Sequence, residues 1–255
     1  MSTSAQASAA GPIARKDWLA AVILLGAWLH PTSEAQSLQA GPVPPVGGAH
    51  PAPALLNLAD TVQPPGFPVL GKWMIDPDGT PAHWLGEVVD GKGLREPINI
   101  IIVDAGARSP EDAKARLMKA AEAAGYPSRT GHSGGYQGYI GGVLHPQLPS
   151  EKDHALSSGP YEFNNNHGRI FGPFLFEGTY LFTGALSREK VDVLTSPMHQ
   201  YASFNVARDD FAKSMDQATP YKLSGFVNMQ NAIVGDPHTT TGDHDGVAAF
   251  MKAER

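Results

Sequence analysis

The stretch from Ile98 to Val103 (Ile-Asn-Ile-Ile-Ile-Val) most constrains the fold, because it is apolar at nearly every position. A β-branched run without polar alternation is typical of a central strand that is buried on both faces. A helix is predicted directly afterwards: Ser109 can cap it, Pro110 suits its first turn and Gly125 can end it. A strand followed by a helix predicts packed layers of helix and sheet.

The rest of the chain alternates short apolar runs with turns. Glycine (28) and proline (22) are frequent among the 255 residues, which favours many turns over a helical bundle. Further strands are predicted at residues 139–144, 167–176, 179–187, 200–204, 221–228 and 246–251, and a second helix at 206–215 that Asn205 can cap. This order predicts an α/β (α+β) fold, a mixed β-sheet with helices mainly on one face.

The N-terminal region has the pattern of an export signal. Arg15 and Lys16 precede an uncharged apolar run, 18–29, and small residues at Ser33 and Ala35 suit a signal peptidase. We therefore predict a signal peptide at 1–35, a Pro/Gly-rich linker at 36–68 and one α/β domain at 69–255, in the periplasm or secreted. An uncleaved membrane anchor is the alternative, and it would be the chain's one link to a membrane.

Composition excludes several classes of function. The chain has no cysteine, which rules out thiol catalysis, disulfides and thiolate metal sites. Its net charge of -6 and the absence of a long basic run argue against nucleic acid as a partner. The sequence indicates no cofactor.

A row of polar residues gives the first candidate site. On a strand, alternate side chains share a face, so Asn165, His167 and Arg169 would point together. The run from His199 to Asn205 would present a similar row, and the two rows together could hold an anionic group. The alternative is an ordinary polar sheet surface facing solvent.

The segment Gly131-His132-Ser133-Gly134-Gly135 gives the second candidate, since it matches the nucleophile elbow of α/β hydrolases. In that reading Ser133 is the nucleophile, His199 the base and Asp209 the orienting acid, with His238 or His244 and Asp236 or Asp243 as alternatives. The elbow needs a strand before the serine and a helix after it. Neither is predicted here, because both flanks are rich in glycine and polar residues.

The segments Asp236-Pro237-His238 and Asp243-His244-Asp245-Gly246 place carboxylates near imidazoles. Such groups can bind a divalent cation, but the spacing matches no complete metal motif. Asp-Gly before an apolar run is also typical of a tight turn, and we favour that interpretation.

The chain resembles the LssY C-terminal-like domain family of bacterial proteins. The likeness rests on three segments: Pro97-Ile98-Asn99-Ile100-Ile101 with its helix, Asn166-His167-Gly168-Arg169-Ile170-Phe171, and Asp243-His244-Asp245-Gly246-Val247. Where that family usually has Arg-Asp before the histidine and Trp at the aromatic position, this chain has Asn165-Asn166 and Phe171. The resemblance implies the fold and an association with the cell envelope.

These patterns lead to two hypotheses of function, with a purely structural envelope module as a third possibility. The first is an exported, envelope-associated α/β domain that binds a polar or anionic small molecule or envelope component through Asn165, His167, Arg169 and Asn205. The second is a secreted serine ester hydrolase, similar to an esterase or lipase, that uses Ser133.

Overall fold

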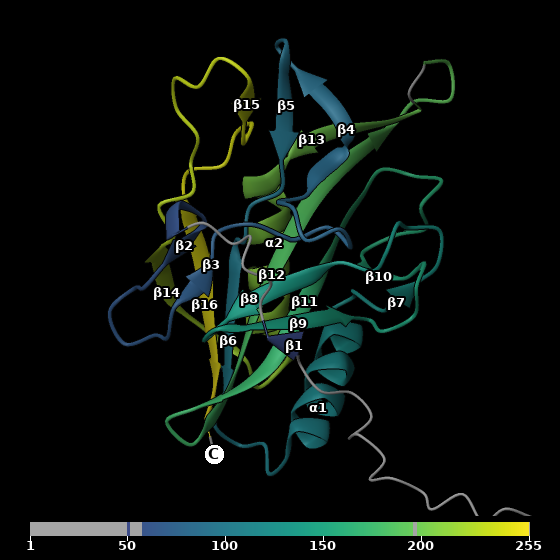
Figure 1. Ribbon diagram of the computed structural model, residues 1–255. Coiled ribbons are helices and arrows are strands. Elements are labelled where there is room, and N and C mark those ends of the chain that lie inside the picture. Colours follow the sequence, from purple (N-terminus) through teal and green to yellow (C-terminus); the bar gives the residue numbers. More distant parts are fainter. Residues whose placement is uncertain (1–49, 52–57, 196–197, 255) are drawn as a thin grey trace, which may run out of the picture. The chain divides into compact units, whose positions relative to one another are not determined.

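The computed structural model describes residues 50–51, 58–195 and 198–254 (Figure 1). The predicted signal peptide and most of the predicted linker lie outside these residues. No helix in the described part of the chain has the length and apolar character needed to cross a bilayer.

Most of the strands belong to one mixed sheet. Its main path runs in the order β14-β16-β6-β12-β11-β9-β8-β3-β2, and β1, β7, β10 and β13 pair at its sides. The strands of this sheet are β1 (His50–Pro51), β2 (Thr61–Val62), β3 (Leu70–Gly71), β6 (Ile100–Asp104), β7 (Ser128–Arg129), β8 (Gln137–Ile140), β9 (Val143–Leu148), β10 (Ala155–Ser157), β11 (Asn165–Phe176), β12 (Thr179–Val191), β13 (His199–Ser203), β14 (Lys222–Asn228) and β16 (Val247–Ala253). A smaller sheet holds β4 (His83–Val89), β5 (Lys92–Arg95) and β15 (Thr239–Thr240).

The apolar run at 98–103 contributes residues 100–103 to the interior strand β6, and Ile98 and Asn99 precede it. β6 pairs in parallel with β16 and antiparallel with β12, so it has a neighbour on each side. Ile100 and Ile102 pack into one hydrophobic cluster, whereas Ile101 packs into another. The strand is therefore buried on both faces, which explains why its sequence lacks polar alternation.

The first predicted helix is confirmed. α1 spans Pro110–Ala123, and the Ser109 hydroxyl accepts a hydrogen bond from the amide of Asp112 at 3.1 Å. Gly125 follows with φ 85°, a conformation that glycine adopts without steric cost.

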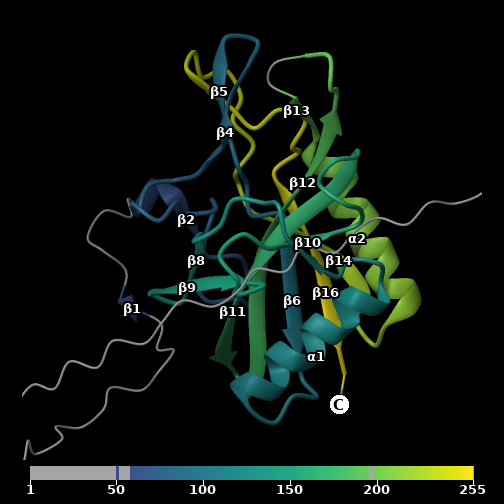
Figure 2. The ribbon, with the colours of Figure 1, turned by 90° about the vertical axis from the view of Figure 1, so that its right-hand side faces the viewer.

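The second helix, α2, spans Phe204–Ala218 and begins two residues before the predicted range. Its cap is Ser203, whose hydroxyl accepts from the amide of Val206 at 2.9 Å, and not Asn205 as predicted. α1 and α2 contact each other and share the cluster that contains Ile100 (Figure 2).

A long hairpin of β11 and β12 carries the candidate site. Glu177 (φ 48°) and Gly178 (φ 73°) form its two-residue turn, and both have the positive φ that hairpin turns favour. β13 pairs with the far end of β12, so β12 lies between β11 and β13. The two polar rows expected from the sequence are thus separated by a third strand.

Two expectations for the chain's organisation need correction. The single strand expected at 139–144 is a hairpin, β8 and β9, which turns at Gly141 and Gly142. Residues 58–68, expected in the linker, belong to the fold: β2 pairs with β3, and the side chain of Val62 is buried in the core. The folded part therefore begins before Val69.

Candidate functional site

A pocket of about 150 Å³ opens beside the β11–β12 hairpin. Its polar wall comes from five places: His167 and Arg169 on β11, Glu189 on β12, His199 at the start of β13, Glu96 just after β5, and the loop residues His132 and Ser133. Segments far apart in the sequence therefore meet at one small hollow. His167 and Arg169, predicted as neighbours, line it together.

The strand register explains how these side chains meet. Asn165, His167 and Arg169 alternate along β11, and their partners on β12 are Glu189, Ser187 and Ala185. Side chains of paired residues share a face of the sheet. The small Ala185 stands opposite Arg169, where it leaves room for the large guanidinium group.

His167 is held by hydrogen bonds on both ring nitrogens. The indole of Trp84 donates to the Ser187 hydroxyl at 3.0 Å, and that hydroxyl lies 3.4 Å from His167 Nε2. Because Ser187 accepts from Trp84, its own proton is free to reach Nε2, and Nδ1 then donates to Asn165 Oδ1 at 3.3 Å. Burial sets the pKa of His167 well below its usual value. His167 is therefore a neutral, fixed wall of the pocket.

Asn165 and His199 together hold the buried carboxylate of Glu189. The Asn165 amide donates to Glu189 Oε1 at 2.5 Å, and His199 Nδ1 lies 3.1 Å from Oε2. The side chain of Glu189 is only 3% exposed, and burial raises its pKa. The Glu189 carboxylate accepts a hydrogen bond from Nδ1 of His199, so the other ring nitrogen, Nε2, is left for other partners. A general base requires this arrangement. The ring of Tyr161 stacks on His199 at 6.0 Å.

Arg169 is the one arginine that lines the pocket. One of its terminal nitrogens donates to the Ser133 carbonyl at 2.5 Å, and its guanidinium lies 4.8 Å from the centre of the Tyr136 ring. The residue is 3% exposed, and its Nε has no hydrogen-bond partner among the described residues. A buried donor without a partner costs about 1–3 kcal/mol, and more when the group is charged. Arg169 thus places a buried cation with an unsatisfied donor in the wall of the pocket.

Glu96 and His132 complete the polar wall, and both are shifted toward neutrality. Burial raises the pKa of Glu96 to about 7, although the positive charge of Arg169 opposes this shift. Burial, with Arg169 as a second cause, lowers the pKa of His132 to about 4. The His132 ring packs on His167 at 4.8 Å, and its buried Nε2 lacks a partner in the part of the chain that the structure describes. Arg169 therefore keeps its positive charge at neutral pH, whereas burial favours the neutral forms of Glu96 and His132.

Ser133 lies in the pocket but not on a nucleophile elbow. Its loop runs from the strand β7 into the strand β8, where the elbow requires a helix. Its hydroxyl is hydrogen-bonded to the Tyr136 hydroxyl at 2.8 Å rather than to an imidazole. The glycines have a packing role: a Cβ at Gly134 would lie 1.5 Å from the Lys152 carbonyl oxygen. The Gly-x-Ser-x-Gly match thus reflects a tightly packed loop.

Three other predicted site residues do not line the pocket. Asp209, the expected acid, is bonded to Arg208 on α2 at 2.7 Å, and the carboxylate on His199 is Glu189 instead. Asn205 bonds the backbone carbonyl of Asp243 and does not line the pocket. Asn165 is buried and is hydrogen-bonded to Glu189 and His167, which do line the pocket.

The acidic and histidine-rich segments near the C-terminus make structural contacts. Asp236 accepts from the amides of His238 and Thr239, each at 2.8 Å, as in an Asx turn. The Asp243 carboxylate accepts from the Phe204 amide at 2.8 Å, at the start of α2. Among residues 50–51, 58–195 and 198–254, no group of three or more His, Cys, Asp or Glu is placed to hold a metal ion.

Sequence reasoning missed Glu189 and Glu96. The strand predicted at 179–187 stopped two residues short of Glu189, and the break in hydrophobicity at Arg188-Glu189-Lys190 concealed its continuation to Val191. Glu96 follows a short strand in a different sheet, so no local pattern connects it with β11.

The chain was compared with protein-family models, with curated proteins and with solved structures, and none of these comparisons gave a match.

Proposed function

We propose that the domain binds a small anionic molecule in the pocket beside Arg169. The observation that carries this proposal is the buried guanidinium of Arg169, whose Nε has no partner and which lines an open hollow. Charge-assisted bonds from arginine to phosphate or carboxylate oxygens are strong. An oxyanion in the pocket would be attracted by this buried cation.

The size and the protonation state of the pocket support the same ligand class. A hollow of about 150 Å³ admits a group of benzene size, so a phosphate or carboxylate head fits. Burial raises the pKa of Glu96 to about 7, so the protonated form of this carboxyl group is populated near neutral pH. In that form its carboxyl group donates a hydrogen bond to an oxyanion instead of repelling it.

The test is a titration with inorganic phosphate, followed by calorimetry and by thermal stability. Wild type should bind, and Arg169→Lys should weaken binding at least tenfold because lysine lacks the planar fork of donors. Arg208→Lys is the matched control, since Arg208 is also buried but is bonded to Asp209, Asp245 and the Val247 carbonyl. Equal phosphate binding by wild type and Arg169→Lys would refute the proposal.

We also propose that the chain is exported and associated with the envelope. The basic residues, the apolar run and the small residues near Ala35 support export, and the resemblance to the LssY C-terminal-like family supports the envelope. Mass spectrometry of the N-terminus after expression in a bacterial host tests this. Chains that stay in the cytoplasm and retain residues 1–35 would refute it.

Ester hydrolysis is a second candidate, favoured by the hydrogen bond between His199 and Glu189 in the same pocket as Ser133. In this scheme Ser133 Oγ attacks an ester carbonyl, His199 Nε2 takes the hydroxyl proton, and the same proton later goes to the leaving alkoxide. The hydroxyl must first leave Tyr136. A fluorophosphonate probe should then label wild type and not Ser133→Ala, and an unlabelled wild type would refute this candidate.

A further inference from the structure

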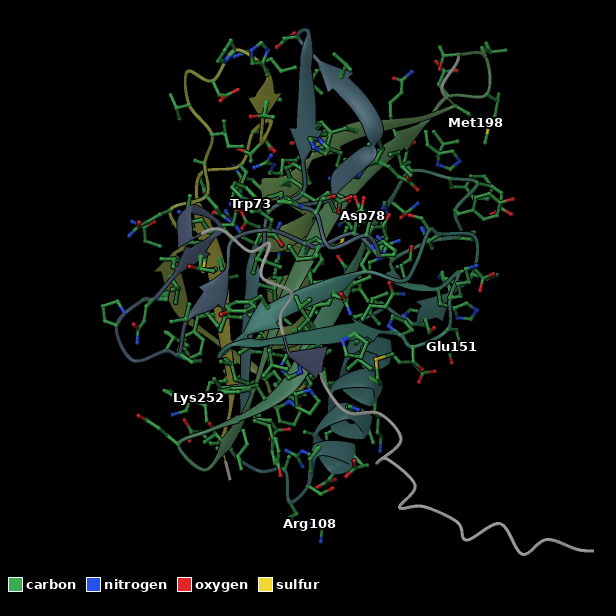
Figure 3. The ribbon with its side chains drawn as sticks, in the orientation of Figure 1. Trp73, Asp78, Arg108, Glu151, Met198 and Lys252 are labelled. Carbon is green, nitrogen blue, oxygen red and sulfur yellow. The ribbon has the colours of Figure 1, made fainter. Side chains whose placement is uncertain are left out.

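A second hollow adjoins the pocket, and its lining contains more exposed apolar side chains. It has a volume of about 590 Å³ and shares Trp84, Leu85 and His199 with the pocket. Its further lining comes from β4 and from the start of β13, with Val88 and Met198 as its apolar side chains. Met198 directly precedes β13 and is labelled in Figure 3. We call this second hollow the groove.

The groove exposes large apolar side chains beside a polar pocket. Leu85 is 60% exposed, Val88 61% and Met198 38%. Exposed apolar side chains scattered singly need no explanation, but a cluster at the rim of a ligand pocket indicates a binding surface. Its polar lining residues are Glu87, His199 and Gln200, and the Glu87 carboxylate is already engaged, because it accepts from the Tyr201 amide at 2.7 Å.

The backbone of β4 supports the same conclusion. The register of β4 against β5 shifts between His83 and Val88, so this stretch bulges out of the smaller sheet. Leu85, inside the bulge, has a φ of 43°, which a leucine adopts only at a cost. Leu85 is thus held in a strained conformation on the boundary between pocket and groove. Strain of this kind is concentrated at functional sites.

We propose that the ligand is an amphiphile, whose anionic head lies beside Arg169 and whose single apolar chain lies in the groove along Leu85, Val88 and Met198. This inference rests on the proposed function, since the pocket must hold the head. The two hollows share the lining residues Trp84, Leu85 and His199, so the groove adjoins the pocket and a chain attached to the head lies within reach of it. The occupant of the groove is therefore the ligand's own chain.

The test is a series of soluble alkyl phosphates: ethyl, butyl and octyl phosphate, titrated by calorimetry below their micelle concentrations. Complete burial of one methylene is worth about fourfold in affinity, so a groove open on one side should give about twofold per methylene. Wild type should therefore bind octyl phosphate at least tenfold more tightly than ethyl phosphate. Val88→Ser and Met198→Ser should each reduce this ratio. Val234→Ser, at a valine that is 90% exposed outside the groove, should leave it unchanged.

The outcomes separate the two proposals. If ethyl and octyl phosphate bind equally and both lose affinity in Arg169→Lys, the head site stands and the amphiphile inference is wrong. If none of the phosphates binds, both proposals fall. A chain-length gain that persists in Val88→Ser and Met198→Ser would place the chain elsewhere and overturn the inference. So would binding to phosphatidic acid vesicles without binding to octyl phosphate, because the apolar rim would then face a membrane.

Discussion

Burial of the Glu96 side chain opposes ionisation of its carboxyl group, and a single substitution can measure the resulting loss of stability. Glu96 is 6% exposed, and burial raises its pKa from 4.5 to about 7. Below pH 4.5 the carboxyl is neutral in the folded and unfolded chain, and no cost arises. As the pH rises toward 7, the unfolded chain ionises first. The folded state is then destabilised by about 3 kcal/mol, at about 1.4 kcal/mol per pKa unit.

Glu96→Gln should therefore be more stable than wild type at pH 7.5 and equally stable near pH 4.5. Glutamine keeps the shape and cannot ionise. The measurement is the free energy of unfolding of both proteins in urea at the two pH values. A difference that does not depend on pH would contradict the raised pKa.

Leu85 allows a separate test of stored strain. Leu85→Asn should raise the free energy of unfolding by about 1 kcal/mol, because asparagine tolerates positive φ far better than leucine and a 60% exposed side chain contributes little burial. Val88→Asn is the matched control, since Val88 is equally exposed but has no positive φ. If the two substitutions change stability equally, the bulge of β4 holds no strain.

At the scale of elements, two residues can be compared as the N-cap of α2: Ser203, which the structure shows, and Asn205, which the sequence predicts. Ser203→Ala should lower the free energy of unfolding by about 1 kcal/mol, because the Ser203 hydroxyl accepts from the Val206 amide at 2.9 Å. Asn205→Ala should cost less, since the half-buried Asn205 side chain bonds the backbone of Asp243 and Asp245 and not an amide of the first helical turn. Urea unfolding of both variants gives the comparison. A larger loss in Asn205→Ala would restore the cap that the sequence predicts.

The sequence predicts elements well where the signal is local. α1 carries its cap, its first-turn proline and its terminal glycine within seventeen residues, and the structure confirms it. β6 is equally local, because burial on both faces is visible in its composition. α2 is displaced because Ser203 and Asn205 are both good caps. The choice depends on Asp243, which is 40 residues away from Ser203.

The sequence predicts only the part of the candidate site that comes from a single strand, β11. The alternation of His167 and Arg169 correctly places both on one wall. Glu189 comes from the neighbouring strand, and its contact with His199 depends on a register that no single segment encodes. For the same reason Asp209, an acid near His199 in sequence, is wrong as its partner: it points to Arg208 on a helix.

At the scale of the whole molecule, buried histidines set the response to acid. Burial lowers the pKa of His132, His145 and His244 to about 4, and that of His167 well below its usual value. Each ring must stay neutral in the folded state. Its contribution to stability is therefore complete above pH 6.5 and is lost as the pH falls toward 4. Glu96 acts in the opposite direction over the same range, because its cost disappears on acidification.

The effect of one buried histidine on acid stability can be measured separately at His145, because this residue does not line the pocket. Its buried Nε2 has no partner in the described residues, and it is 6% exposed. Between pH 7 and pH 5 this histidine alone should cost the folded state about 2 kcal/mol. His145→Gln should reduce the loss of stability over that range by this amount, whereas Glu96→Gln should enlarge it by removing the compensating carboxyl. Urea unfolding of the three proteins at both pH values measures the two effects. Parallel losses in all three would show that neither group controls acid stability.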